Sequence, residues 1–333
     1  MSLLEPKFWA GTRGNLNEYP IYMLFVSSLV LAGAMSQKPT TKPPEVEPDP
    51  LLLNVRRADR LSVTTNNWFD LNDGKQSSLD AFVKAADNYH FVFLGESHDD
   101  PVHHQMQANV IDGLVKRGRT VIVGFEMFTR PNQENLNAWT LGKETEDEFI
   151  KNSNWQKEWG FSFSLYRPIF NVIKENRLPM VALNVPRDWV RSVGKSGLKG
   201  LTAEQQAQVP TVLTNNANHK AVFDGLMGGH PMVGPQGDNI YAAQCLWDEG
   251  MADTALKYVT NRFGSPSTMP KNAVFVIVAG MGHGLYKQGI NWRIMRRTGL
   301  DTLTLINVEG EKPMAISRGV ADFVYVAPNF ARK

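Results

Sequence analysis

The sequence predicts an α/β fold with a mostly parallel sheet that helices cover on both faces. Apolar segments without polar alternation recur along the chain, for example at residues 121–125 and 273–279. Such segments are typical of parallel strands that are buried on both sides. Between them lie segments with helical spacing, as in Val102, Met106 and Val110. This alternation indicates helices that cross over from one parallel strand to the next.

The individual elements follow from the same patterns. Strands are expected at residues 68–71, 91–94, 121–125, 180–183, 273–279, 301–308 and 323–326, and helices at 78–86, 102–116 and 239–258. The segments at about 130–178 and 187–238 are longer than a strand–helix crossover needs. We therefore expect one α/β domain over residues 51–330, with two helical insertions that form a lid or second lobe. Within the second insertion, residues 219–232 are expected to form a flexible loop.

The first fifty residues differ in composition from the rest. Lys7 and Arg13 precede an apolar run that ends Leu31-Ala-Gly-Ala34, which is the pattern of a secretory signal. Residues 1–34 thus predict a signal peptide or anchor for an exported, periplasmic or envelope-associated protein, although a disordered tail is an alternative. Lipoprotein signals carry Cys where Ala34 stands, so no acylation is expected there. Residues 35–50 are proline-rich and predict an extended linker.

Composition excludes several classes of protein. The 333 residues are 42% hydrophobic, which supports one large domain, and 35 basic residues against 33 acidic ones give no basic excess for nucleic acid. The single Cys245 excludes an internal disulfide framework and a Cys-based zinc site. No Gly-x-Ser-x-Gly elbow is present, which argues against a serine hydrolase.

Polar side chains follow the predicted strands at the points where these strands end. Glu96 and His98 follow the first buried strand, Glu126 the second, and His283 the fourth. Carboxyl ends of parallel strands share one edge of a sheet, so we expect these groups to converge. Together they could bind a divalent metal ion or perform acid/base chemistry. As an alternative, each could be only a cap or a local hydrogen-bond partner.

Two residues outside these strand exits are also candidates. His104 lies in the first turn of the helix at 102–116, where it could equally cap the helix or face solvent. Asp248 lies next to Trp247 on the helix at 239–258, and it could hydrogen-bond to His283 or His98 and orient that imidazole. A solvated Asp248 is the alternative.

Several segments, in one order along the chain, together resemble the ChaN-like haem-binding family of bacterial iron-regulated lipoproteins. This family is grouped with the erythromycin-esterase-like and Tiki/TraB proteins. The matching segments include Leu94-Gly-Glu-Ser-His-Asp, Gly124-Phe-Glu-Met-Phe, Tyr166-Arg-Pro-Ile, Val181-Ala-Leu-Asn-Val-Pro-Arg and Ala279-Gly-Met-Gly-His-Gly. Gly95 and His98 also match the Gly-x-x-His signature of the Tiki/TraB relatives, which implies descent from metal-dependent hydrolases.

The resemblance implies a three-layer α/β/α core and non-covalent haem bound near a homodimer interface. It also implies a Tyr as iron ligand, a choice that suits ferric haem. Tyr166 lies in a matching segment and Tyr286 follows His283, so these two are the candidates. His104, Arg187 and Asp248 are further candidates for contacts to the cofactor. No Cys-x-x-Cys-His is present, which excludes covalent haem attachment.

Three functional hypotheses follow. The first is a haem-binding protein of the bacterial cell envelope, involved in haem or iron uptake or handling, with an outer-membrane haem receptor as partner. The second is a metal-dependent hydrolase that uses Glu96, His98, Glu126 and His283. The third is a non-catalytic scaffold that contacts partners through its Trp-rich insertions.

Overall fold

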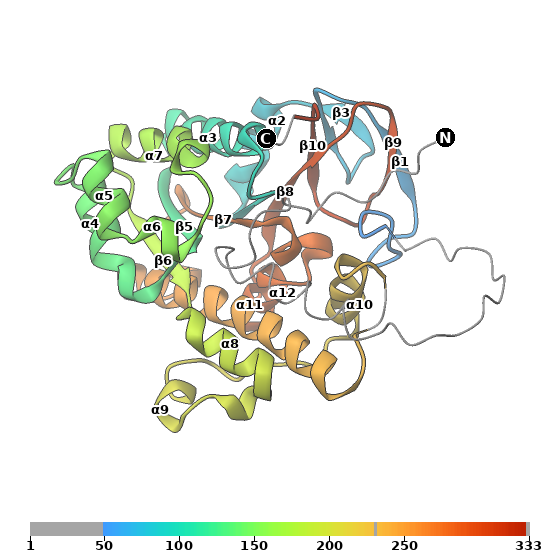
Figure 1. Cartoon of the computed structure of the whole chain (residues 1–333). Helices are drawn as coiled ribbons and strands as arrows, with labels where there is room; N and C mark the ends of the chain where they lie inside the picture. The colour runs from blue at the N-terminus through green and yellow to red at the C-terminus, as the bar shows by residue number, and fades with distance from the viewer. Residues whose placement is uncertain (1–48, 230–231, 331–333) are drawn as a thin grey trace.

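The computed structural model describes residues 49–229 and 232–330. The predicted signal segment at 1–34 and most of the predicted linker at 35–50 lie outside these residues. Most of the described chain surrounds one eight-stranded sheet, which helices flank on both sides (Figure 1). None of the helices within the described ranges has the length and apolar character needed to span a membrane.

The predicted mostly parallel sheet is confirmed. In spatial order its strands are β3 (Lys75–Ser77), β2 (Asn67–Asp70), β10 (Phe323–Ala327), β8 (Thr302–Glu309), β4 (Phe91–Glu96), β7 (Ala273–Gly280), β5 (Thr120–Thr129) and β6 (Met180–Asn184). All neighbours from β10 to β6 pair in parallel, whereas β2 and β3 add an antiparallel edge. A second, two-stranded sheet joins β1 (Arg60–Val63) to β9 (Met314–Ser317). These two short strands were not predicted, because they lack a continuous apolar run.

Helices form the outer layers, which confirms the three-layer core. One face carries α2 (Leu79–Ala85), α3 (Pro101–Lys116), α4 (Gln133–Thr140), α5 (Glu146–Asn152), α6 (Trp155–Glu158) and α7 (Phe163–Asn176). The other face carries α11 (Gly234–Phe263) and α12 (Ile290–Thr298), and α8 (Arg187–Ser196) and α10 (Ala217–Leu226) pack against α11. The short helix α9 (Ala203–Gln206) follows α8.

Strand β4 shows why the sheet is buried on both faces. Val92 and Leu94 pack against the layer that contains α3, whereas Phe91 and Phe93 pack against the layer that contains α11. All four side chains have 0% exposure. Because successive side chains on a strand point to opposite faces, a fully apolar strand requires cover on both sides.

The turn from β4 into α3 is fixed by local capping. The Asp100 side chain accepts hydrogen bonds from the backbone N–H groups of Val102 (2.7 Å) and His103 (3.3 Å), and Pro101 is the first helical residue. An Asp N-cap followed by Pro is a strong helix start. The Ser97–Asp99 segment is therefore held between the end of β4 at Glu96 and the capped start of α3 at Asp100.

Two local predictions need correction. Strand β5 continues to Thr129 through an irregularity after Phe125, so Glu126 lies within the strand and not beyond its end. The expected loop at 219–232 begins as helix α10, because Asn216 caps it by accepting from the His219 N–H (3.1 Å). Its face with Val222 and Phe223 is buried against neighbouring elements.

The two long crossovers contain several helices each. Residues 130–178 form a 3₁₀ turn, η2 (Arg130–Asn132), and helices α4 to α7. Residues 187–229 and 232–238 contain α8, a second 3₁₀ turn, η3 (Leu198–Gly200), then α9, α10 and the start of α11. The remaining 3₁₀ turns are η1 (Ala86–Asn88), η4 (Pro266–Thr268), η5 (Met281–His283) and η6 (Leu285–Lys287).

Candidate functional site

Glu96, the last residue of β4, is the centre of a buried polar cluster. Its Oε1 accepts a hydrogen bond from the Tyr166 hydroxyl (2.7 Å) and lies 3.0 Å from Nδ1 of His98. Its Oε2 lies 3.2 Å from Nδ1 of His104. The carboxylate of Glu96 therefore orients three side chains, from the turn between β4 and α3, from α3 and from α7.

His98 is held through its backbone as well as its ring. Its carbonyl oxygen lies 3.1 Å from Nε2 of His104 and 3.3 Å from the Tyr166 hydroxyl. Its imidazole packs edge-on against Trp159, with ring centroids 4.6 Å apart. The His98 side chain keeps 11% exposure, so this ring reaches the rim of the cluster.

A second carboxylate–histidine pair lies across the sheet edge. His283, in η5 beyond β7, places Nδ1 2.6 Å from Oδ1 of Asp248 and Nε2 3.3 Å from Oε1 of Glu126. The other oxygen of Glu126 accepts a hydrogen bond from the Gly280 N–H (2.7 Å). Asn184, at the end of β6, donates to the backbone oxygen of Glu126 (3.1 Å).

Gly280 is the point where the two pairs meet. A Cβ atom at this position would lie 2.8 Å from Cε1 and 3.1 Å from Nε2 of His98, and 3.6 Å from Oε2 of Glu126. The ring edge of His98 that carries Nε2 therefore faces Gly280 and Glu126. The structure brings Glu96, His98, Glu126 and His283 into one site, with Glu126 between the two imidazoles.

The charges in this site stabilise one another. Burial alone would raise the pKa of Glu126, but the charge of His283 outweighs burial and lowers this pKa to about 2. Burial alone would lower the pKa of His283, but the charge of Glu126 and the hydrogen bond that His283 donates to Asp248 raise it to about 10. His283 is thus a buried cation between two carboxylates at neutral pH.

The Glu96 half of the site shows the same balance. Burial opposes ionisation of Glu96, but the charge of His104 and hydrogen bonds from His104 and His98 outweigh it and hold the pKa of Glu96 far below its ordinary value. The same pairing raises the pKa of His104 against the effect of burial. Burial and the charge of Glu96 raise the pKa of Tyr166 well above its ordinary value. Tyr166 is therefore a neutral hydrogen-bond donor.

Two further sequence candidates, Arg187 and Tyr286, lie outside this cluster. Arg187 is half-buried at the start of α8, 3.6 Å from a carboxylate oxygen of Glu158 and over the ring of Trp159 (5.9 Å). Through Trp159 it borders the rim at His98. Tyr286 is fully buried in the apolar cluster below β8 and β10, away from the polar site.

Tyr166 and Tyr286, the two sequence candidates for the iron ligand, are both buried side chains. Both rings have 0% exposure. The Tyr166 hydroxyl is already bonded to Glu96, and burial raises the pKa of Tyr286 to about 12. His104 and Asp248, two further sequence candidates for contacts to the cofactor, are also fully buried. Motif position alone gave no information on the depth of these side chains.

Sequence reasoning did not identify His219 and Arg293 as site residues. Oδ2 of Asp248 lies 2.9 Å from Nε2 of His219 and 3.4 Å from the Arg293 guanidinium. Both partners are buried and come from α10 and α12. The sequence signals were indirect: Arg293 lies in Gly289-Ile-Asn-Trp-Arg-Ile and His219 shortly precedes Phe223-Asp-Gly-Leu-Met, two further segments that resemble the family.

The expected divalent-metal site finds no support. Within residues 49–229 and 232–330, no group of three or more His, Cys, Asp or Glu side chains is arranged to hold a metal ion. The physical reason is that the carboxylates are already occupied: Glu96 faces Tyr166, His98 and His104, and Glu126 faces His283 and Gly280.

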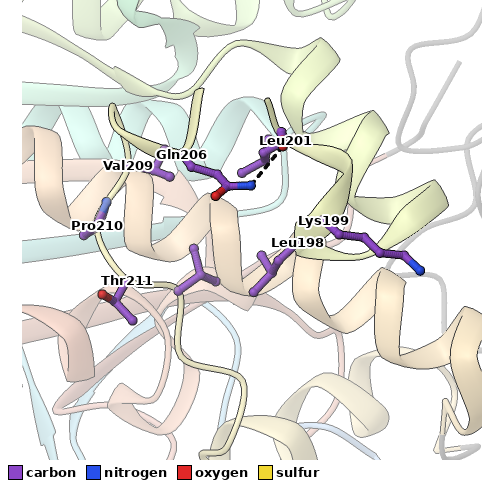
Figure 2. Close-up of a pocket in the computed structure, with 8 residues that line it drawn as sticks. Leu198, Lys199, Leu201, Gln206, Val209, Pro210 and Thr211 are labelled. Carbon is purple, nitrogen blue, oxygen red and sulfur yellow. Dashed lines mark hydrogen bonds between the residues drawn. The ribbon is translucent and has the colours of Figure 1, made fainter. Parts of the chain in front are cut away.

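A hollow of about 380 Å³ lies on the surface near α8 and α9 (Figure 2). It is lined by Leu198, Lys199, Leu201, Gln206, Val209, Pro210, Thr211 and Val212. Its walls are partly apolar, and the Gln206 amide is bonded to the Leu201 backbone oxygen (3.0 Å). The lining shares no residue with the polar site, and it includes no Tyr, His, Met or Cys that could bind iron.

Comparison with protein families gives one match over most of the chain. A family model described as "Haem-binding uptake, Tiki superfamily, ChaN" matches residues 82–294. The matched range contains every residue of the polar site, from Glu96 to Arg293.

Individual relatives are more distant. A structure described as cofacial haem binding to ChaN of Campylobacter jejuni is 20% identical, with a TM-score of 0.59, and the match covers 78% of this chain and 95% of that one. An erythromycin esterase, EreC, in its open conformation is 13% identical with a TM-score of 0.42, over 73% and 77% of the two chains. The first similarity shows a shared fold.

A curated plant protein also matches. "Protein RETICULATA-RELATED 5, chloroplastic" of Arabidopsis thaliana is 22% identical over 260 residues, which is 72% of this chain. The chain spans about a third of the length of that relative, 34%.

Proposed function

The chain belongs to the ChaN family of the Tiki superfamily, the family of haem-binding uptake proteins, and on that premise we propose that it binds haem non-covalently. The observation that carries this proposal is the extent of the family match, which spans residues 82–294 and both halves of the polar site. Bound haem would supply a redox-active iron. The chain would supply apolar contacts to the porphyrin and a side chain that ligates the iron.

Partly exposed tyrosines can reach a bound porphyrin without a rearrangement of the fold. Tyr89, Tyr258 and Tyr325 are the tyrosines of the described residues that keep part of their rings exposed. Of these, Tyr325 packs against Trp68 (5.5 Å between centroids) and pairs in register with Asn307, whose amide donates to the Gly95 oxygen next to Glu96 (2.8 Å). Tyr325 thus fits best as a ligand, since it combines partial exposure, an aromatic neighbour and proximity to the β4 exit.

Titration of haemin into the purified apo-protein tests the proposal. We expect a shifted Soret band that saturates at a fixed stoichiometry. Tyr325→Phe should change that band, whereas Tyr89→Phe and Tyr258→Phe act as matched exposed controls. A spectrum that rises without saturation, like that of haemin in buffer, would rule out specific binding.

We also propose that the protein works in haem or iron handling in the cell envelope, as a homodimer that receives haem from an outer-membrane receptor. Support comes from the signal-like N-terminal pattern and from the family resemblance. Sedimentation with and without haemin tests the dimer, and fractionation of expressing cells tests the location. A strictly monomeric, cytosolic protein would contradict this part of the proposal.

The polar site favours a second candidate function, hydrolysis by acid/base catalysis. The specific observation is that His98 and His283 each bind a carboxylate through Nδ1 and direct Nε2 towards Glu126. A carboxylate fixes the orientation of an imidazole, and an oriented imidazole can transfer a proton to or from a substrate or a water molecule. A passive haem carrier would not require such a site.

Hydrolysis of activated esters such as p-nitrophenyl acetate tests this second function. We expect His98→Ala to lower the rate by about 10²–10⁴-fold, the usual contribution of general acid/base catalysis. His90→Ala is the matched control, because His90 lies before β4, at the opposite end of the strand. Equal rates for His98→Ala and the wild type would show that the site is not catalytic. Parallel assays after chelation would show whether a metal ion takes part.

A further inference from the structure

Helix α10 contributes a buried imidazole to the back of the polar site. His219 is 2% exposed and faces Asp248 through Nε2, at 2.9 Å from Oδ2. The other oxygen of Asp248 contacts Nδ1 of His283 at 2.6 Å. One carboxylate therefore joins two imidazoles, one from the second insertion and one from the strand exit of β7.

Hydrogen-bond donors and acceptors define how His219 is arranged. The ionised Asp248 carboxylate can only accept, so Nε2 of His219 must carry the proton that it shares with Asp248. Nδ1 of His219 lies 3.0 Å from the Tyr241 hydroxyl and 3.8 Å from the Cys245 sulfur, and both of these groups can donate. His219 thus has a fixed tautomer and a fixed ring plane.

Arg293 competes for the same oxygen of Asp248. Its guanidinium lies 3.4 Å from Oδ2 of Asp248 and donates hydrogen bonds to the backbone oxygens of Gln288 (3.3 Å) and Gly289 (3.0 Å), which directly precede α12. If His219 were absent, Arg293 would be the remaining partner of Oδ2. The carboxylate could then turn towards the guanidinium and away from His283.

We propose that His219 is a positioning residue, which fixes Asp248 so that Asp248 in turn directs Nε2 of His283 at Glu126. The proposal gives the second insertion a role in the polar site. An effect of His219 on catalysis rests on the proposed hydrolytic function. The positioning of Asp248 and His283 by His219 does not depend on that function. His219 itself touches neither Glu126 nor the rim at His98.

The test is NMR of the whole protein with ¹⁵N-labelled histidine, which reports the Nδ1–H of His283 bonded to Asp248. A His283→Gln variant assigns this signal. We expect a low-field proton in the wild type that persists in His219→Gln, because the Gln amide nitrogen can occupy the position of Nε2. His219→Ala and His219→Asn should shift or broaden the signal, since neither places a donor next to Oδ2.

Matched variants keep the outcomes distinct. Tyr241→Phe removes a hydroxyl on the far side of His219 and should leave the His283 signal in place. If His219→Ala does not fold, the His283 signals of His219→Asn and His219→Gln are compared with each other instead. Ester hydrolysis should fall by roughly 10–100-fold in His219→Asn and recover in His219→Gln, as for other residues that orient a reacting side chain.

Two results would overturn the proposal: an unchanged His283 signal in folded His219→Asn, or equal loss of that signal in His219→Asn and His219→Gln. Absence of hydrolysis in the wild type would instead contradict the second proposed function and leave the NMR comparison intact as a test of the geometry.

Discussion

Gly280 links the two halves of the polar site because it has no side chain. A methyl group at this position would lie 2.8 Å from Cε1 of His98, closer than real Cβ contacts allow. His98 cannot move away freely, because Glu96 holds its ring nitrogen and Trp159 packs against its ring. The site therefore depends on a glycine whose φ, −53°, any residue could adopt.

We expect Gly280→Ala to displace His98 and to lower the free energy of unfolding by about 1–3 kcal/mol, the usual cost of overpacking. Denaturant unfolding measures the stability, and histidine NMR measures the displacement. Gly282→Ala is the matched control, because a Cβ there would meet only the end of Leu226, at 3.1 Å. Equal effects of the two substitutions would contradict this account.

Titration of His283 makes the free energy of unfolding depend on pH between about 6.5 and 10. Its pKa is raised from 6.5 to about 10 in the folded protein, since the charge of Glu126 and the bond to Asp248 outweigh burial. A raised pKa stabilises the fold fully below about pH 6.5, and that contribution is lost as pH rises towards 10. Between pH 7 and 10 the free energy of unfolding should fall more in the wild type than in His283→Gln.

Denaturant unfolding at pH 7, 8.5 and 10 measures this difference. Titrating groups that do not interact with His283 cancel when the two proteins are compared, and His90→Gln should follow the wild-type curve. Parallel curves for the wild type and His283→Gln would show that the imidazole of His283 gains no proton affinity on folding.

At the scale of elements, one side chain pairs with backbone groups at the outer edge of the sheet, on strand β6. Gln133 of α4 donates to the Met180 backbone oxygen (2.8 Å) and accepts from the Ala182 N–H (3.0 Å). It thus satisfies two ladder groups that an edge strand leaves unpaired. This contact also joins the first insertion to the strand that places Asn184 beside Glu126.

Gln133→Ala should lower the free energy of unfolding by about 1–3 kcal/mol, because two buried backbone groups lose their partner. Gln133→Glu retains an acceptor but no donor, so an intermediate loss is expected. Gln156→Ala, which removes a single exposed contact of 3.4 Å to the Gly160 oxygen, is the control. A Gln133→Ala variant as stable as Gln156→Ala would show that solvent replaces the side chain without cost.

At the scale of the whole molecule, the first insertion shares one apolar core with the sheet. Phe128 of β5 packs against Trp155 (5.5 Å between centroids), and Phe125 stacks on Phe170 (5.4 Å). These rings belong to the same cluster as the strand residues Val92 and Val276. The insertion therefore has no separate core of its own.

The insertion and the sheet should unfold together. We expect denaturant transitions followed by Trp fluorescence and by far-UV circular dichroism to coincide. Trp155→Ala should shift both midpoints downwards by the same amount, with a loss of about 3–5 kcal/mol for a buried aromatic ring. Separate transitions for the two signals, or a shift in only one, would show that the insertion is an independent unit.

The sequence by itself determined the parallel sheet and the set of polar groups at its carboxyl edge. Apolar strands such as Phe91–Glu96 are visible as local patterns, and parallel strands necessarily deliver their exits to one edge. Tertiary structure alone decided the depth and the pairing of the side chains. Tyr166 is buried against Glu96, and Asp248 contacts His219, 29 residues earlier in the chain and in another helix. Such contacts depend on how helices pack over the sheet, and helix packing leaves no periodic signal in the sequence from which a specific partner could be predicted.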